Sequence, residues 1–128
     1  MKKLFISCPM NGRDEEAITK SMDKMHKLME AILGEKLEVI ETYIDEDAPN
    51  NVNAGVWYLS KSIELLAEAD YFVGFGFYLS FTEKYKGCEI EAMIADHYDI
   101  PIYLISDENI AEEILSDLKE GGKNERTI

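Results

Sequence analysis

The sequence contains few cysteines and no long apolar run, and both absences restrict where the chain can work. Two cysteines, Cys8 and Cys88, are too few for the disulfide framework of an exported domain. No segment approaches the roughly 18 consecutive apolar residues of a membrane-spanning helix. The apolar stretch near the first residue is also too short for the core of a signal peptide. We therefore expect a soluble, cytoplasmic protein with reduced thiols and no membrane partner.

Positive charge is scarce as well. Thirteen Lys and Arg residues face 26 Asp and Glu residues, which gives a formal net charge of -13. This charge disfavours binding to nucleic-acid polymers, whose phosphates would be repelled. It leaves room for a phosphorylated small molecule, because the free N–H groups at the start of a helix can bind an anion locally.

The familiar metal and nucleotide motifs are missing too. The cysteines, His26 and His97 form no pair at the short spacing of metal ligands, so we expect no metal site. The loop over residues 8–12 has neither the glycine pattern of a dinucleotide fingerprint nor the Gly-Lys-Ser/Thr ending of a phosphate loop. We accordingly expect no cofactor.

The order of apolar segments predicts a single α/β domain over residues 1–120, followed by a flexible tail over 121–128. A helical stripe of apolar residues begins after residues 13–16 and ends at Gly34. Further helices are expected over 55–68, 88–98 and 107–118, and strands over 3–7, 37–42, 71–77 and 101–105. This alternation indicates a three-layer α/β/α sandwich with a four- to five-stranded parallel sheet, as in flavodoxin-like and Rossmann-like folds.

Ligands of such sheets bind beyond the carboxyl ends of the strands. The loops over 7–12 and 75–87, and the loop after 105, should therefore form the site. Gly87 precedes a helix whose first turns hold Glu89 and Glu91, where a carboxylate could act as a nucleophile, a general base or a clamp for sugar hydroxyls. The alternative is that both glutamates are simply favourable charges near a helix start.

Two further features allow either a functional or a structural interpretation. Asp70 lies where a helix meets the central strand, so it could orient Glu91 or bind a ligand, or it could be an ordinary junction residue. Trp57 and Phe77 adjoin loops and could enclose a flat heterocycle. These two aromatic residues could equally belong to the core or to an oligomer interface.

As an ordered set, three segments resemble the nucleoside 2-deoxyribosyltransferase family, in particular its phage-associated branch. They are Lys-Leu-Phe-Ile-Ser-Cys-Pro-Met-Asn-Gly over residues 3–12, Ala-Asp over 69–70, and Gly-Cys-Glu-Ile-Glu-Ala over 87–92 followed by Ile-Pro-Ile over 100–102. The resemblance spans roughly residues 3–105. It implies a deoxynucleoside or deoxynucleotide as the small-molecule partner, and a homo-oligomer with sites near the subunit contacts.

The resemblance also implies roles for individual residues. Glu91 matches the glutamate that attacks the anomeric carbon and forms a covalent deoxyribosyl ester, with retention of configuration after a second base or water attacks. Asp70 matches an aspartate that orients this nucleophile and assists proton transfer to the departing base. Tyr85 is included among the catalytic positions. The residues expected to contact substrate are Ser7, Pro9, Met10, Gly12, Trp57, Phe77, Gly87 and Cys88.

Two positions depart from the family pattern. Tyr85 stands about where active members have an acidic residue, and Phe5 stands where they have a tyrosine near the end of the first strand. Glu83 is a candidate to replace the missing acid. The leading hypothesis is transfer or hydrolysis at the N-glycosidic bond, and the alternative is a non-catalytic protein that binds a nucleotide-derived ligand on the same fold.

Overall fold

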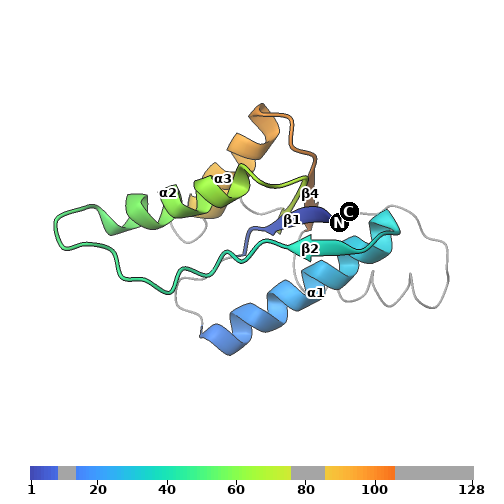
Figure 1. The fold of residues 1–128 in the computed structure, drawn as a ribbon, viewed down its shortest axis with the longest axis horizontal. Helices are drawn as coiled ribbons and strands as arrows, with labels where there is room; N and C mark the ends of the chain where they lie inside the picture. Colours follow the sequence, from blue (N-terminus) through green and yellow to red (C-terminus); the bar gives the residue numbers. More distant parts are fainter. Residues whose placement is uncertain (9–13, 76–85, 106–128) are drawn as a thin grey trace.

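The computed structural model describes residues 1–8, 14–75 and 86–105, which form an alternating series of strands and helices (Figure 1). The elements are β1 (Lys2–Ile6), α1 (Glu15–Leu33), β2 (Leu37–Val39), α2 (Ala54–Leu66), β3 (Tyr71–Phe75), α3 (Lys86–His97) and β4 (Ile102–Ile105). None of the described helices is both long and apolar enough to cross a membrane.

The four strands form one sheet in the order β2-β1-β3-β4, and every neighbouring pair is parallel. The expected parallel α/β fold is thus confirmed. The strand order changes direction between β1 and β3, where Leu4 lies opposite Tyr71 and Ile6 lies opposite Val73. In a sheet of this order the switch point is the place where ligands bind, at the edge where the strands end. We call this the carboxyl edge, and the opposite edge, where the strands begin, the amino edge.

Alternate residues of β1 face two different apolar clusters. Leu4 and Ile6 pack with α1 residues such as Met25 in one cluster. Phe5 packs with Leu66 of α2, together with Ala92 and Ala95 of α3, in the other. Because successive side chains of a strand point to opposite faces, α1 covers one face of the sheet and α2 and α3 cover the other, as Figure 1 shows.

The first helix forms as its apolar spacing predicts. Asp14 caps its start by accepting a hydrogen bond of 2.8 Å from the backbone N–H of Ala17. Gly34 ends it in the left-handed conformation, with φ of 70°, which favours glycine. The carboxylate of Glu30 then accepts hydrogen bonds from the backbone N–H of Leu37 (2.8 Å) and from His26 Nε2 (3.1 Å), and so fixes the turn into β2.

The second strand is shorter than expected, because its pairing with β1 ends at Val39. The alternating burial of a strand nevertheless continues for several more residues, since Ile40 and Thr42 are buried while Glu41 and Tyr43 are exposed. Ile40 belongs to the cluster on the α2 and α3 face. By the same alternation, Thr42 points to that face too.

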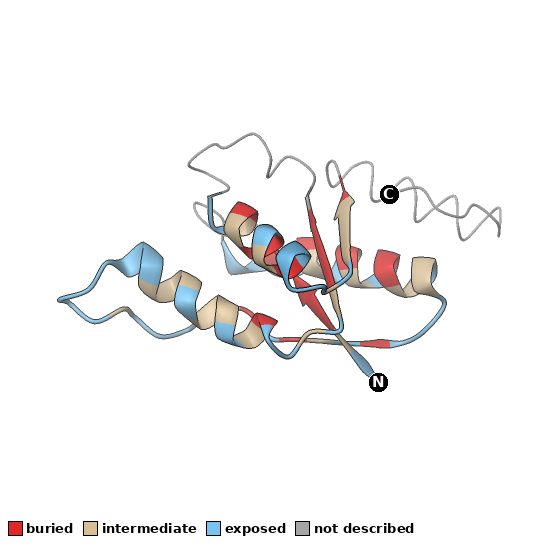
Figure 2. Cartoon of the chain, turned by 90° about the horizontal axis from the view of Figure 1, so that it is seen from above, coloured by how far each residue is buried: buried red, intermediate tan, exposed pale blue. Residues whose placement is uncertain are grey.

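The amino-terminal half of α2 and the loop before it extend beyond the sheet and are largely exposed (Figure 2). Tyr58 ties this loop to the helix. Its hydroxyl donates to the carbonyl of Glu46 (3.0 Å) and accepts from the N–H of Ala48 (3.3 Å). The expected helix over 107–118 and the expected tail over 121–128 lie outside the described residues.

Candidate active site

Ser7, the residue that follows β1, lies at the switch point. Its backbone N–H donates a 2.8 Å hydrogen bond to the carbonyl of Val73 on β3. The sheet therefore fixes the position of Ser7. Gly74 lies next along β3, and a Cβ atom there would stand 3.5 Å from the Cβ of Ser7 and 3.1 Å from the ring of Phe72. The glycine therefore leaves space beside the serine. The side chain of Ser7 points to the α2 and α3 face, two residues beyond Phe5.

The hydroxyl of Ser7 donates a hydrogen bond of 2.7 Å to Oε1 of Glu91, in a buried environment. Glu91 comes from the second turn of α3, and only 8% of its surface is exposed. A buried carboxyl group must be hydrogen-bonded to be tolerated. The end of β1 and the start of α3 thus bring a hydroxyl and a carboxyl group together at the carboxyl edge.

Burial raises the pKa of Glu91 above its ordinary value of 4.5. Hydrogen bonds from two serines, Ser7 and then Ser62 of α2, oppose this rise because they stabilise the ionised form. Neither serine hydroxyl carries a charge. The carboxyl group is therefore held by the hydroxyl of Ser7 and lies near the hydroxyl of Ser62 on α2.

Cys88 lies one turn before Glu91 and is half-buried. Burial, the largest cause, raises the pKa of its thiol to about 12, although a hydrogen bond with Ser7 acts in the opposite direction. The neighbouring Glu91 and Cys8 raise it further. Neither Cys8 nor Cys88 forms a disulfide.

Thr42 carries a buried hydroxyl that has no hydrogen-bond partner among residues 1–8, 14–75 and 86–105. Only 4% of the residue is exposed. An unpaired buried hydroxyl costs about 1–3 kcal/mol. It lies two residues beyond Ile40, which belongs to the apolar cluster that also contains Phe5.

The two glutamates of the expected motif are both buried, with 8% of each exposed. The hydrogen bond with Ser7 distinguishes Glu91 from Glu89. Gly87 lies in the first turn of α3, is exposed, and has no atom within 4 Å of the position that a Cβ would take. The structure therefore brings together Ser7, Cys88 and Glu91 from the residues selected in the sequence, with Gly87 nearby on the same helix.

Asp70 is placed elsewhere. Its carboxylate accepts a 2.8 Å hydrogen bond from the backbone N–H of Lys3, and its own N–H donates to the carbonyl of Lys3, also at 2.8 Å. Lys3 is four residues before Ser7, a distance of about 13 Å along a strand. Asp70 thus lies at the amino edge, and the expectation that it orients Glu91 must be corrected, because the start of a parallel strand is remote from the edge where α3 begins.

Two aromatic positions have structural contacts. The ring of Phe5 stacks on Phe72, with centroids 5.7 Å apart, and is buried in the core. Trp57 is half-buried, packs edge-to-face against Tyr58, and lies 5.2 Å from the ammonium group of Lys61. It stands five positions before Ser62, which places the two on different sides of α2. No described contact joins Trp57 to Glu91.

The remaining selected residues lie outside the described part of the chain, so their expected roles stay predictions. They are Pro9, Met10, Gly12, Phe77 and Tyr85, together with Glu83.

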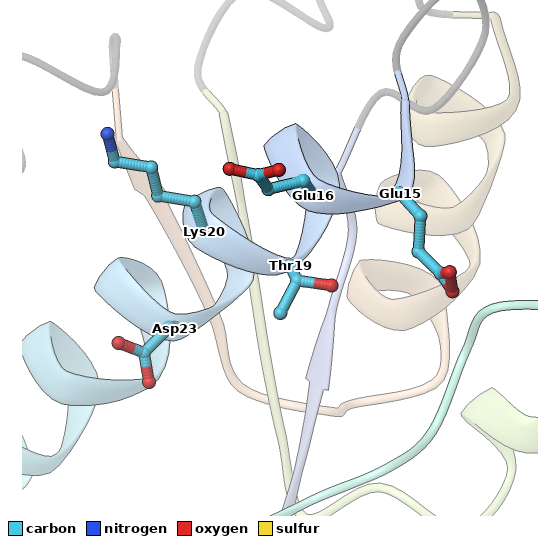
Figure 3. Close-up of a pocket in the computed structure, with 5 residues that line it drawn as sticks. All are labelled: Glu15, Glu16, Thr19, Lys20 and Asp23. Carbon is cyan, nitrogen blue, oxygen red and sulfur yellow. The ribbon is translucent and has the colours of Figure 1, made fainter.

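No cluster of three or more metal-ligating side chains occurs within residues 1–8, 14–75 and 86–105. A separate hollow lies on the exposed side of α1, where Figure 3 shows Glu15, Glu16, Thr19, Lys20 and Asp23 projecting from the helix. It is on the opposite face of the sheet from Glu91 and is mainly acidic. It therefore forms no part of the candidate active site.

Ser62 and Thr42 were missed in the sequence. Ser62 carries a recognisable signal, because it interrupts the apolar stripe of α2 between Leu59 and Leu66, at helical spacing from both. A small polar residue in such a stripe must find a partner in the packed helix interface. The sequence signal for Thr42 is weaker. A threonine has nearly the shape of a valine, so its position in the sequence does not distinguish it from an ordinary buried residue.

Comparison with models of protein families, with curated proteins and with solved structures finds no match to this chain.

Proposed function

We propose that this protein is a nucleoside 2-deoxyribosyltransferase-like enzyme. It would cleave the N-glycosidic bond of 2-deoxynucleosides or their monophosphates and transfer the deoxyribosyl group to another base or to water. The observation that supports this most strongly is the buried carboxyl group of Glu91, held by Ser7 at the carboxyl edge of the sheet. A nucleophilic carboxylate needs such a fixed position beside a site that accepts the sugar.

In the proposed reaction, ionised Glu91 attacks the anomeric carbon from the face opposite the base. The bond from that carbon to the base nitrogen breaks, and its electron pair leaves with the base, which takes up a proton. The product is a deoxyribosyl ester of Glu91. A second base or a water molecule then attacks the same carbon from the other face and releases Glu91, so the configuration is retained. These steps require no cofactor.

The raised pKa of Glu91 has two opposing effects on this chemistry. A smaller fraction of the enzyme holds the ionised nucleophile at a given pH. The ionised form is, however, poorly solvated where it is buried, which makes it more reactive once formed. We therefore expect the rate of base release to rise with pH through the titration of Glu91.

Ser7 offers an answer to one departure from the family pattern. Phe5 lacks the hydroxyl that a tyrosine would provide, but Ser7 lies on the same face of the sheet and donates to Glu91. The proposal assigns no catalytic role to Asp70, whose carboxylate is bound to the backbone of Lys3 at the amino edge.

A second candidate function is a non-catalytic protein that binds a nucleotide-derived ligand. The raised pKa of Glu91 favours it, because a protonated carboxyl group donates a hydrogen bond to a ligand but does not attack carbon. On either hypothesis the partner is a small molecule, and we place the protein in the cytoplasm. We also propose a homo-oligomer, for which the exposed Val56 and the half-buried Trp57 of α2 offer an apolar surface.

The test is an assay of deoxyadenosine with free cytosine, and separately of the four deoxynucleoside monophosphates. Base exchange or base release should be detected by chromatography, and a mass increase on the peptide that contains Glu91 should be trapped. The Glu91→Gln variant should lose at least about 10³-fold in turnover, since it lacks the nucleophile. Asp96→Asn is the matched control, because Asp96 is exposed on the same helix.

The outcomes separate the two candidates. Absence of exchange, base release and trapped ester with all four bases would exclude the enzyme. If the wild type and Glu91→Gln then show the same thermal shift with a deoxynucleotide, the binding protein is supported.

A further inference from the structure

Strand β2 lies at one edge of the sheet, because β1 is its only neighbour in the described part of the chain. The N–H of Ile40, directly after β2, donates a 3.0 Å hydrogen bond to the carbonyl of Leu4 on β1. Successive residues of a strand point their N–H and C=O groups to alternate sides. The main-chain groups of Leu37 and Val39 therefore point away from β1, to the free edge.

Both main-chain groups of Leu37 are bound by side chains of α1. Its N–H donates to Oε2 of Glu30 at 2.8 Å, and its carbonyl oxygen lies 3.0 Å from Nε2 of His26. The same Nε2 lies 3.1 Å from Oε2 of Glu30. Because both neighbours of Nε2 are acceptors, we assign a proton to this nitrogen and a hydrogen bond to each acceptor. The two side chains are four residues apart on α1, which ends beside the start of β2 (Figure 1).

The free edge of a strand is a template for pairing with another chain. Two copies of β2 related by a two-fold axis could pair antiparallel, because each would present the same outward groups to the other. Within β2 these outward groups belong to Leu37 and Val39 alone. With Leu37 occupied, a single residue is left, which cannot form a continuous ladder.

We propose that His26 and Glu30 block the free edge of β2 and so prevent it from pairing with β2 of a second copy of this chain. The proposal does not depend on the chemistry proposed for Glu91, because α1 covers the opposite face of the sheet. It also restricts the proposed homo-oligomer. That assembly must use a surface other than the edge of β2, such as the exposed part of α2.

The test is a double variant, His26→Ala with Glu30→Ala, which frees both main-chain groups of Leu37. The matched control is Asp23→Ala with Lys27→Ala, since these residues form an exposed ion pair of 3.0 Å at the same spacing on α1. Alanine is a strong helix former, so α1 should persist in both variants, and circular dichroism checks this. Light scattering after size-exclusion chromatography measures the mass at several protein concentrations. Hydrogen exchange reports on the amide of Leu37.

The double variant should reach at least about twice the mass of the wild type as its concentration rises, while the control keeps the wild-type mass. In dilute solution the amide of Leu37 should exchange about tenfold faster in the double variant, because its hydrogen bond to a carboxylate is lost. At high concentration a partner strand should protect this amide again. Adding Val39→Pro should restore the wild-type mass, because proline lacks the outward N–H that the partner strand needs.

The proposal is overturned if the double variant keeps the wild-type mass at every concentration. It is also overturned if association persists after Val39→Pro, because the copies would then meet through another surface. If the double variant does not fold, His26→Ala and Glu30→Ala as single variants decide in its place, since each frees one group of Leu37. None of these measurements uses turnover, so a failure of the proposed deoxyribosyl transfer leaves their result unaffected.

Discussion

The hydroxyl of Ser7 and the carboxyl group of Glu91 lie 2.7 Å apart although 84 residues separate them in the chain. One residue follows directly after the first strand of the sheet, and the other lies on the helix that follows the third strand. Their contact can form only after β1 and β3 have paired and α3 has packed on the sheet. The candidate active site is thus a property of the assembled domain and of no single segment.

The first prediction concerns how stability depends on pH. Because burial raises the pKa of Glu91 in the folded state, the folded protein keeps a proton that the unfolded chain releases above about pH 4.5. Stability contributed by this group should therefore fall as pH rises from that value through the folded-state pKa. Glu91→Gln removes the titrating carboxyl group and keeps a side chain that can form hydrogen bonds.

Urea denaturation across pH 4–8 measures this effect. Glu91→Gln should be close to the wild type in acid and increasingly more stable as pH rises. Other charges are common to both proteins and cancel in the difference. Asp96→Asn, exposed on the same helix, should show no widening gap. A constant difference for Glu91→Gln would show that burial does not suppress ionisation of this group.

Replacing Asp70 by Asn should leave turnover unchanged. Asp70 lies at the amino edge and binds the N–H of Lys3, about 13 Å along the strand from Ser7. A small loss of stability is expected from the weaker hydrogen bond, similar to that of Glu68→Gln, which breaks the 3.2 Å ion pair with Lys3 at the same edge. A tenfold or greater fall in the rate of base release would instead show that Asp70 contributes to the reaction.

Thr42→Val should stabilise the protein. The valine keeps the shape of the side chain and removes a buried hydroxyl that has no partner among the described residues, so the free energy of unfolding should rise by about 1 kcal/mol. Thr19→Val is the control, because Thr19 is exposed on α1 and nothing comparable is gained there. If Thr42→Val were destabilising in urea denaturation, the hydroxyl would have to be satisfied in solution, for example by a bound water.

Cys88 should resist alkylation in the folded protein. With its pKa raised from 9.0 to about 12, the thiolate fraction at pH 8 is roughly a thousandfold below that of an ordinary thiol. Peptide mass spectrometry after treatment with iodoacetamide should show little label on Cys88, and little on the buried Cys8. Both should react in urea. Rapid labelling of native Cys88 would contradict the burial of its sulfur.

The fold could be predicted because its signals are local. The apolar stripe ending at Gly34 and the apolar run from Tyr71 each specify an element without reference to the rest of the chain. The length of β2 could not be predicted in this way. Residues 40–42 keep the alternating burial of a strand, yet the pairing with β1 stops at Val39.

The candidate site was only partly predictable, for a similar reason. Glu91 was selected from a local motif, and it lies at the carboxyl edge beside Ser7, while its role in a site stays a prediction. The rule that ligands bind at the carboxyl edge would have excluded Asp70 from the candidate site, because Asp70 lies at the start of its strand and therefore at the amino edge. The break that Ser62 makes in the apolar stripe of α2 is a local signal, but the pattern of α2 alone does not show which residue of α3 lies opposite it.

The suppressed reactivity of Cys88 has a practical consequence for measuring ligands. A cysteine introduced at Glu68, whose side chain is exposed at the amino edge, would be the reactive thiol among the described residues. A fluorescent dye or a resin could then be attached there without first replacing the native cysteines. Such an attachment leaves the edge with Ser7 and Glu91 unobstructed, and the labelled protein can then be tested for a response to the small molecules proposed as its ligands.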